Sequence, residues 1–129
     1  MPISRIDVIK SRSNDEAQAI INALHTAQVE VLKVPAHDRQ IRYIEHKPEH
    51  FAIPPGKTDN YTLIELCIFP GRSRETKKAL YQAIVSNLGK LGVEPSDIFI
   101  VLHEPPLDNW GIRGGQIASE VDFGYPIVR

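Results

Sequence analysis

Two stretches of the chain, sixty positions apart, show the same alternation of hydrophobic and polar residues. Residues 4–13 read SRIDVIKSRS and residues 64–73 read IELCIFPGRS, so that Ile6 corresponds to Leu66. Alternation with a period of two is typical of a half-buried β-strand. Each stretch then ends in an arginine and a serine, and serine is a preferred N-cap of a helix. The pattern therefore predicts two strands, each followed directly by a helix.

Apolar residues at helical spacing follow both serines. The first helix begins with a capping box, in which the side chains of Ser13 and Glu16 satisfy backbone groups at the helix start. The apolar stripe of this helix is Ala17, Ile20, Ile21, Leu24 and Val31, and that of the second helix is Leu80, Ala83, Ile84, Leu88 and Leu91. His25 lies among polar residues of the first helix, so we expect it at the surface or in a subunit contact.

An apolar strand follows each helix. Pro35 precedes the stretch IRYIEH that begins at Ile41, and Pro95 precedes the stretch IFIVLHE that begins at Ile98. A helix of about eighteen residues between two strands is a normal crossover for a parallel pair. The sequence thus predicts an α+β fold, in which two tandem β-α-β units form a four-stranded mixed sheet with both helices on one face. Because the other face also contains apolar residues, we expect further subunits of a symmetric oligomer to bury it.

The 129 residues correspond in length to a single domain, residues 1–129. Its pseudo-repeats span about residues 2–48 and 61–104, and a C-terminal hairpin and tail span residues 105–129. The tail contains turn residues around Trp110 and ends in FGYPIVR, a short strand-like piece. Between the units lies HKPEHFAIPPGKTDN, a long loop with three prolines. Such loops are either functional or disordered.

Composition and charge narrow the possible partners. The net charge of −1 at pH 7 argues against a nucleic-acid or anionic-membrane partner. No signal peptide is visible, and no segment approaches the roughly 18 apolar residues of a membrane span. Cys67 is the single cysteine, which fits a reducing, cytoplasmic compartment, and it has no evident base partner. His46 and His50 have metal-ligand spacing, but Pro48 prevents a regular helix there, so we expect no metal site.

Pro2 has two interpretations. In the first, it begins a strand, where the missing N–H costs nothing. In the second, removal of Met1 leaves the ring nitrogen as a secondary amine that carries or accepts a proton. The second unit begins with Tyr61 and Thr62, so the strand itself does not require a proline. An α-amino group has a reference pKa of roughly 7.7–8.0, which burial and nearby guanidinium groups lower further.

These features together resemble the tautomerase superfamily. PISRIDVIKSRS is similar to the start of 4-oxalocrotonate tautomerase, and WGIRGGQIAS resembles the C-terminal hairpin of that family. The doubled unit resembles the malonate semialdehyde decarboxylase branch. That branch shares the VP-x-x-DR element at residues 34–39, the arginines Arg72 and Arg74, and a tryptophan near the hairpin, here Trp110. The resemblance implies a homotrimer without cofactor or metal, whose substrates are small 2-oxo or 3-oxo acids.

The resemblance also implies roles for individual residues. Pro2 is expected to be the general base and acid for keto–enol tautomerisation of a small 2-oxo acid such as phenylpyruvate. Arg72 and Arg74 lie at the start of the second helix, where cations are unfavourable, so we expect a functional reason for them. Guanidinium groups there could lower the pKa of the proline amine, bind the substrate carboxylate and stabilise an enolate. Arg12, at the matching position of the first unit, is expected to contact substrate.

Two residues keep two interpretations each. Asp38 activates water or holds a substrate hydroxyl beside a cationic proline, as in the decarboxylases, or it turns the loop after Pro35. Trp110 stacks on an aromatic substrate, or it packs in the core or an interface. The alternatives to a tautomerase are therefore a malonate semialdehyde decarboxylase- or hydratase-like enzyme with cationic Pro2 and Asp38, and a non-catalytic oligomeric binding protein.

Overall fold

The computed structural model describes residues 2–125 of the chain. Six main elements and a short hairpin follow one another along it. They are β1 (Ile3–Val8), α1 (Asn14–Leu32), β2 (Ile41–Glu45), β3 (Thr62–Cys67), α2 (Arg74–Gly89), β4 (Ile98–His103), β5 (Gly111–Ile112) and β6 (Gln116–Ile117). The tandem β-α-β arrangement predicted from the sequence is confirmed.

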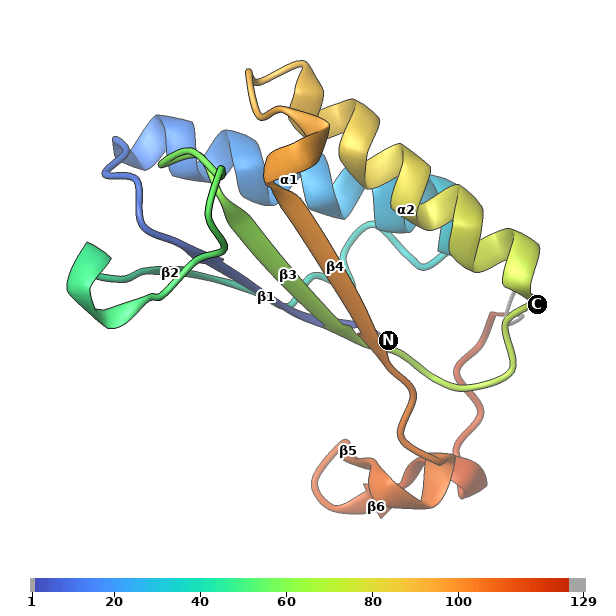
Figure 1. Ribbon diagram of the computed structural model, residues 1–129. Helices are drawn as coiled ribbons and strands as arrows, with labels where there is room; N and C mark the ends of the chain where they lie inside the picture. The colour runs from blue at the N-terminus through green and yellow to red at the C-terminus, as the bar shows by residue number, and fades with distance from the viewer. Residues whose placement is uncertain (1, 126–129) are drawn as a thin grey trace.

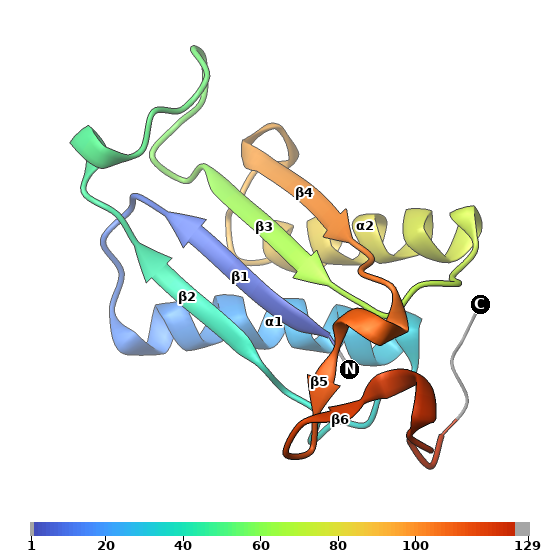
Figure 2. The same ribbon diagram turned by 90° about the horizontal axis from the view of Figure 1, so that it is seen from below.

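The main sheet has the strand order β2-β1-β3-β4. The outer pairs β1–β2 and β3–β4 are parallel, and the central pair β1–β3 is antiparallel. Both helices cover one face of this sheet and leave the other face open (Figures 1 and 2). In the central pair, Ile3 lies opposite Cys67, so the start of β1 and the end of β3 are at the same end of the sheet. Residues before β1 and after β3 therefore meet there.

The main core lies between the sheet and the two helices. Its fully buried side chains alternate along β1 and β3 and follow the inner stripes of α1 and α2: Ile6, Val8, Ile64, Leu66, Ile20, Leu24, Leu80, Ile84 and Leu88. Both serine caps form as predicted, with Ser13 Oγ accepting from Glu16 N at 3.2 Å and Ser73 Oγ accepting from Thr76 N at 3.1 Å. Leu91 was expected in the second stripe, but α2 ends at Gly89 and leaves Leu91 45% exposed.

His25 corrects another expectation. It is buried rather than at the surface, because its ring turns inward against the loop that follows α1. Its Nε2 lies 2.8 Å from the carbonyl oxygen of Ala36, and a carbonyl only accepts, so Nε2–H donates this bond. The polar residues around His25 in the sequence suggested an exposed position, but the loop after α1 packs over its ring and buries it.

A second apolar cluster covers the end of the sheet where β1 begins. It is built by Phe69, after β3, and by Trp110, Ile112 and Ala118 of the C-terminal hairpin region. Ile3, the first residue of β1, packs against it. The hairpin region thus lies next to the N-terminus of β1 (Figure 2). Of the strand-like piece predicted at residues 123–129, residues 123–125 are irregular, and residues 126–129 lie outside the described part of the chain.

The loop between β2 and β3 is ordered against the body of the protein. Its 3-10 turn, Pro48–His50, precedes Phe51, whose ring packs edge-on against His46 and Tyr61 with centroid distances of 5.3 and 6.0 Å. Further along the loop, Thr58 bonds to the carboxylate of Asp97 beside β4. These contacts connect the loop to the ends of β2 and β3 and to the turn before β4.

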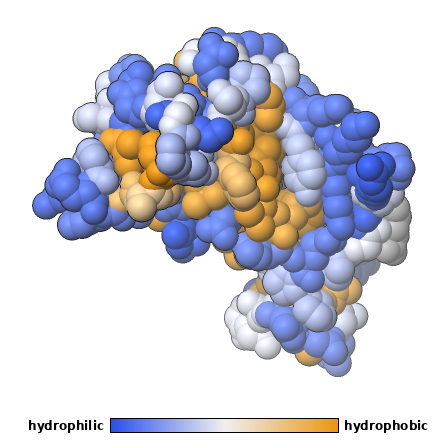
Figure 3. Space-filling model, in the orientation of Figure 1, coloured by the Kyte–Doolittle hydropathy of each residue, from blue (hydrophilic) through white to orange (hydrophobic). Residues whose placement is uncertain are grey.

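The open sheet face carries both apolar and charged side chains. Phe99, on the edge strand β4, is 55% exposed, and Figure 3 shows apolar side chains gathered over the side of the molecule where β4 lies. At the end of the same edge strand, His103 Nε2 lies 2.8 Å from Oε1 of Glu65 on β3. Neither helix among residues 2–125 is long and apolar enough to cross a membrane.

Candidate active site

Arg72 provides a buried positive charge where β3 leads into α2. Its side chain passes under the end of α1, where Nη1 donates to the carbonyl oxygen of Leu32 at 3.3 Å. The last carbonyls of a helix have no partner within the helix, so this bond satisfies one of them. Burial lowers the pKa of Arg72, while Tyr125 and Glu104 act in the opposite direction. The guanidinium still remains charged at neutral pH, because the ordinary pKa of arginine is far above neutral.

A cavity of about 360 Å³ lies between the loop after α1 and the C-terminal segment. Pro35, His37 and Asp38 line it on one side, and Arg113, Phe123 and Tyr125 line it on the other. Burial is the main cause of a raised pKa at Tyr125, and the negative charge of Asp38 adds to it. Arg72 and Arg113 act against this rise, so both guanidinium groups lie within electrostatic range of the Tyr125 hydroxyl.

Pro2 is buried at the same end of the molecule. It directly precedes Ile3, which packs on the same apolar cluster as Phe123 of the cavity wall. The backbone N–H of Ser4 donates to the carbonyl of Gln40 at 2.9 Å, which ties the start of β1 to the loop that carries Asp38. Met1 lies outside the described residues.

Most of the predicted site residues lie at one end of the sheet, and Arg12 lies at the other. The antiparallel pairing of β1 with β3 brings Pro2 and Arg72 to one end of the sheet, and the parallel pairing of β1 with β2, in which Ser4 lies opposite Ile41, brings the loop that carries Asp38 to the same end. Arg74 is exposed at the first position of α2, two residues after Arg72. Arg12 follows the other end of β1, where its Nη1 donates to Tyr43 Oη at 2.8 Å. One chain therefore does not bring Arg12 together with Pro2.

Trp110 lies inside the second apolar cluster. Its ring contacts Phe69 edge-on, with centroids 4.9 Å apart, and Nε1–H donates to the carbonyl of Pro105 at 3.0 Å. The side chain is 7% exposed. These contacts agree with the packing interpretation, and contact with a substrate stays a prediction.

Three further residues at this end were not singled out from the sequence. Tyr125 lies in the irregular segment after the hairpin and Arg113 in the turn between β5 and β6, and no periodic pattern marks a functional side chain in either place. Gln28 is fully buried on α1 and donates through Nε2 to Ser4 Oγ at 2.6 Å, two residues from Pro2. Gln28 follows Leu24 by one helical turn, on the apolar face of α1. This position indicates a buried amide, and a buried amide needs a polar partner.

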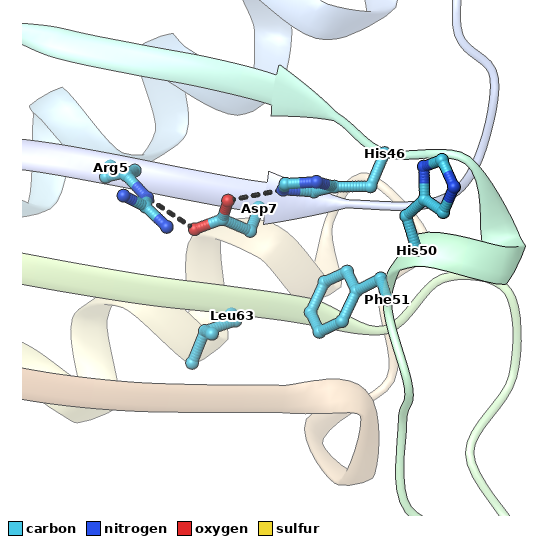
Figure 4. Close-up of a pocket in the computed structure, with 6 residues that line it drawn as sticks. All are labelled: Arg5, Asp7, His46, His50, Phe51 and Leu63. Atoms are coloured by element: carbon cyan, nitrogen blue, oxygen red, sulfur yellow. Dashed lines mark hydrogen bonds and ion pairs between the residues drawn. The ribbon is translucent and has the colours of Figure 1, made fainter.

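A separate pocket of about 140 Å³ lies on the open sheet face. Figure 4 shows the carboxylate of Asp7 between Arg5 and His46, with Arg5 Nε at 2.9 Å and His46 Nε2 at 2.6 Å. His50 also lines this pocket. Within residues 2–125, no group of three or more His, Cys, Asp or Glu side chains is arranged to hold a metal ion. The imidazole of His46 is instead paired with Asp7.

Comparisons with known proteins agree with this geometry. Residues 38–113 match the sequence family described as "Tautomerase enzyme". The probable tautomerase YusQ of Bacillus subtilis (strain 168) is 30% identical over 122 residues, which cover 90% of this chain and 96% of that protein.

Solved structures give the same result. The structure of FG41 malonate semialdehyde decarboxylase inhibited by 3-bromopropiolate is 33% identical, with a TM-score of 0.75, and the match covers 89% of this chain and 92% of that one. Native fused 4-OT has the same fold, with a TM-score of 0.83 at 19% identity over 95% of this chain and 99% of that one. The doubled β-α-β fold and these similarities show that the chain belongs to the tautomerase superfamily and is an enzyme of the tautomerase type.

Proposed function

We propose that the protein interconverts the keto and enol forms of small 2-oxo acids such as phenylpyruvate, with the nitrogen of Pro2 as general base and acid. The observation that carries this proposal is the meeting of Pro2, Arg72 and Asp38 at one end of the sheet. Removal of Met1 converts the Pro2 nitrogen from an amide into a secondary amine. Burial and the positive charge of Arg72 both disfavour the protonated amine. They therefore keep the amine neutral, and able to accept a proton, near neutral pH.

The arginines supply substrate binding. A guanidinium group binds a carboxylate through two parallel hydrogen bonds, which fixes orientation as well as charge. Arg72 is held by the end of α1, so it is already oriented before substrate arrives. Arg74 is exposed at the start of α2 and provides a second cation near the same end. The acid group of a 2-oxo acid is the natural partner for this pair.

The proton moves between two atoms of the substrate. Neutral Pro2 takes the proton from the enol oxygen, and an arginine stabilises the enolate that forms. Protonated Pro2 then delivers that proton to the neighbouring carbon and returns to its neutral form. Asp38 contributes a negative charge beside the cavity, which would stabilise the protonated amine between these steps.

Assembly is part of the proposal. The open sheet face, with exposed Phe99 on its edge strand, needs a cover. Structures of fused 4-OT proteins that share this fold are described as symmetric and asymmetric trimers. We therefore infer that the protein is a homotrimer in which neighbouring subunits bury this face.

Three forms of the protein test the role of Pro2. These are the mature protein, a Pro2→Ala variant and a form with one extra residue ahead of Pro2, each checked by mass spectrometry for loss of Met1. Ketonisation of phenylpyruvate enol should be fastest for the mature protein and partly retained in Pro2→Ala, which keeps a primary amine. The extended form has only an amide at Pro2, so it should be nearly inactive.

Equal turnover by the extended and mature forms would show that Pro2 only begins a strand. Circular dichroism of all three forms provides the control for folding. A parallel assay with malonate semialdehyde separates the tautomerase from a decarboxylase, because decarboxylation releases carbon dioxide and ketonisation does not.

A further inference from the structure

The C-terminal segment returns to the active-site end of the sheet after the hairpin. Figure 1 shows it rising from β6 toward the beginning of α2. Phe123 packs against Phe69 with centroids 4.8 Å apart, and Arg113 Nη1 donates to the carbonyl of Asp122 at 3.3 Å. The N–H of Gly124 donates to Asp122 Oδ1 at 2.9 Å. These contacts hold the backbone on both sides of Phe123 and direct residue 125 toward the loop after α1.

Tyr125 connects this segment to Asp38. Its ring packs against the main apolar core, and both residues line the same cavity. Tyr125 and Asp38 line opposite sides of this cavity, and the charge of Asp38 and a hydrogen bond to its side chain both contribute to the raised pKa of Tyr125. A carboxylate only accepts, so the hydroxyl donates. The raised pKa of Tyr125 keeps this donor protonated throughout the neutral range.

The loop that carries Asp38 is anchored through other residues. His25 donates to the carbonyl of Ala36, and the guanidinium of Arg39 donates to the side chain of Asn22 on α1. The first bond holds the backbone two residues before Asp38 and the second holds the side chain of the residue after it, but neither involves the Asp38 carboxylate. The hydroxyl of Tyr125 acts on that carboxylate directly.

We propose that Tyr125 is a positioning residue, whose hydroxyl orients the Asp38 carboxylate toward the substrate cavity. The C-terminal segment is then part of the active site rather than only a cover for the hairpin. This inference rests on the proposed function, because it assigns Tyr125 a role that acts through Asp38. Tyr125 acts without touching the reacting atoms.

The test compares Tyr125→Phe with Tyr81→Phe. The first variant removes the hydroxyl and keeps the ring, and Tyr81, half-buried on α2, gives a matched loss of one hydroxyl elsewhere. Hydrogen bonds to charged groups are strong, so kcat for ketonisation should fall roughly tenfold to a hundredfold in Tyr125→Phe. KM should change less than about twofold, because the arginines still bind the substrate carboxylate. Tyr81→Phe should keep the wild-type kcat.

A double-mutant cycle separates positioning from general stabilisation. If Tyr125 acts through Asp38, adding Tyr125→Phe to Asp38→Asn should cause no further loss of kcat. The cycle is repeated with Asp38→Glu, which keeps the charge but displaces it from the hydroxyl. Independent losses that multiply, or a wild-type kcat in Tyr125→Phe, would overturn the inference. Such a result would leave the proposed function intact as long as the Pro2-extended form is inactive, whereas an active extended form would refute the proposed function itself.

Discussion

Arg72 and Arg74 are two residues apart, but the fold uses them differently. Arg72 is 6% exposed and supports the end of α1 through the carbonyl of Leu32, whereas Arg74 is exposed. Changing either residue to Ala should lower kcat/KM for phenylpyruvate enol about tenfold to a hundredfold, because each loses a charged contact to the substrate carboxylate. Only Arg72→Ala should also lower the thermal midpoint, since it leaves a buried carbonyl without its donor.

Steady-state kinetics and thermal unfolding of the two variants check this expectation. Lys78→Ala serves as the control, because Lys78 is an exposed cation on the same helix, outside the proposed site. Wild-type turnover by both arginine variants would mean that Arg72 only supports the end of α1 and that Arg74 is only a solvated residue at the start of α2.

At the scale of elements, one carboxylate joins the long loop before β3 to the turn before β4. Asp97, 2% exposed, accepts hydrogen bonds from the backbone N–H and the hydroxyl of Thr58, at 3.0 and 2.5 Å. These bonds lower the pKa of Asp97. A carboxylate with a lowered pKa stabilises the folded protein above its unfolded pKa of about 3.9, and this contribution is lost as the pH falls through the folded value.

Asp97→Asn should therefore lower the free energy of unfolding by about 1–2 kcal/mol at neutral pH. The difference from wild type should narrow as the pH falls below about 4. Urea unfolding at several pH values measures both quantities. Asp59→Asn, an exposed change in the same loop, gives the baseline. A difference that stays constant with pH would contradict the assignment of this stability to the Asp97 carboxylate.

At the scale of the whole molecule, the open sheet face decides the assembly. Light scattering at micromolar concentration should give about three times the mass of the chain. Phe99→Asp should shift the protein toward smaller species, because it places a charge on an exposed apolar edge strand. Leu91→Asp is the matched control, since Leu91 is similarly exposed but follows α2 on the helical side.

Monomeric wild-type protein would contradict the trimer. Dissociation of the Leu91→Asp variant alone would instead contradict the proposed interface, because the subunit contact would then lie on the helices rather than on the sheet.

Much of the fold follows from local patterns in the sequence. The alternation around Ile6 and Leu66 predicts strands, and the serine caps at Ser13 and Ser73 predict where helices begin, because both signals depend on residues close in the chain. The sixty-residue repeat extends these signals to two β-α-β units. The sequence alone also pointed to Pro2, since its own echo in the second unit has no proline.

Other features depended on which strands pair and in which direction. Arg12 and Arg72 occupy equivalent positions in the repeat, but antiparallel pairing of β1 with β3 sends them to opposite ends of the sheet, and only Arg72 joins Pro2. His25 has polar neighbours in the sequence, and only the loop after α1 makes its position buried. Gln28 lies on the apolar face of α1, but its partner Ser4 comes from β1 and is brought there by the tertiary structure. Tyr125 is far from Asp38 in the chain and has no periodic neighbours. A local sequence pattern does not predict contacts of this kind, because the tertiary structure alone brings the two partners together.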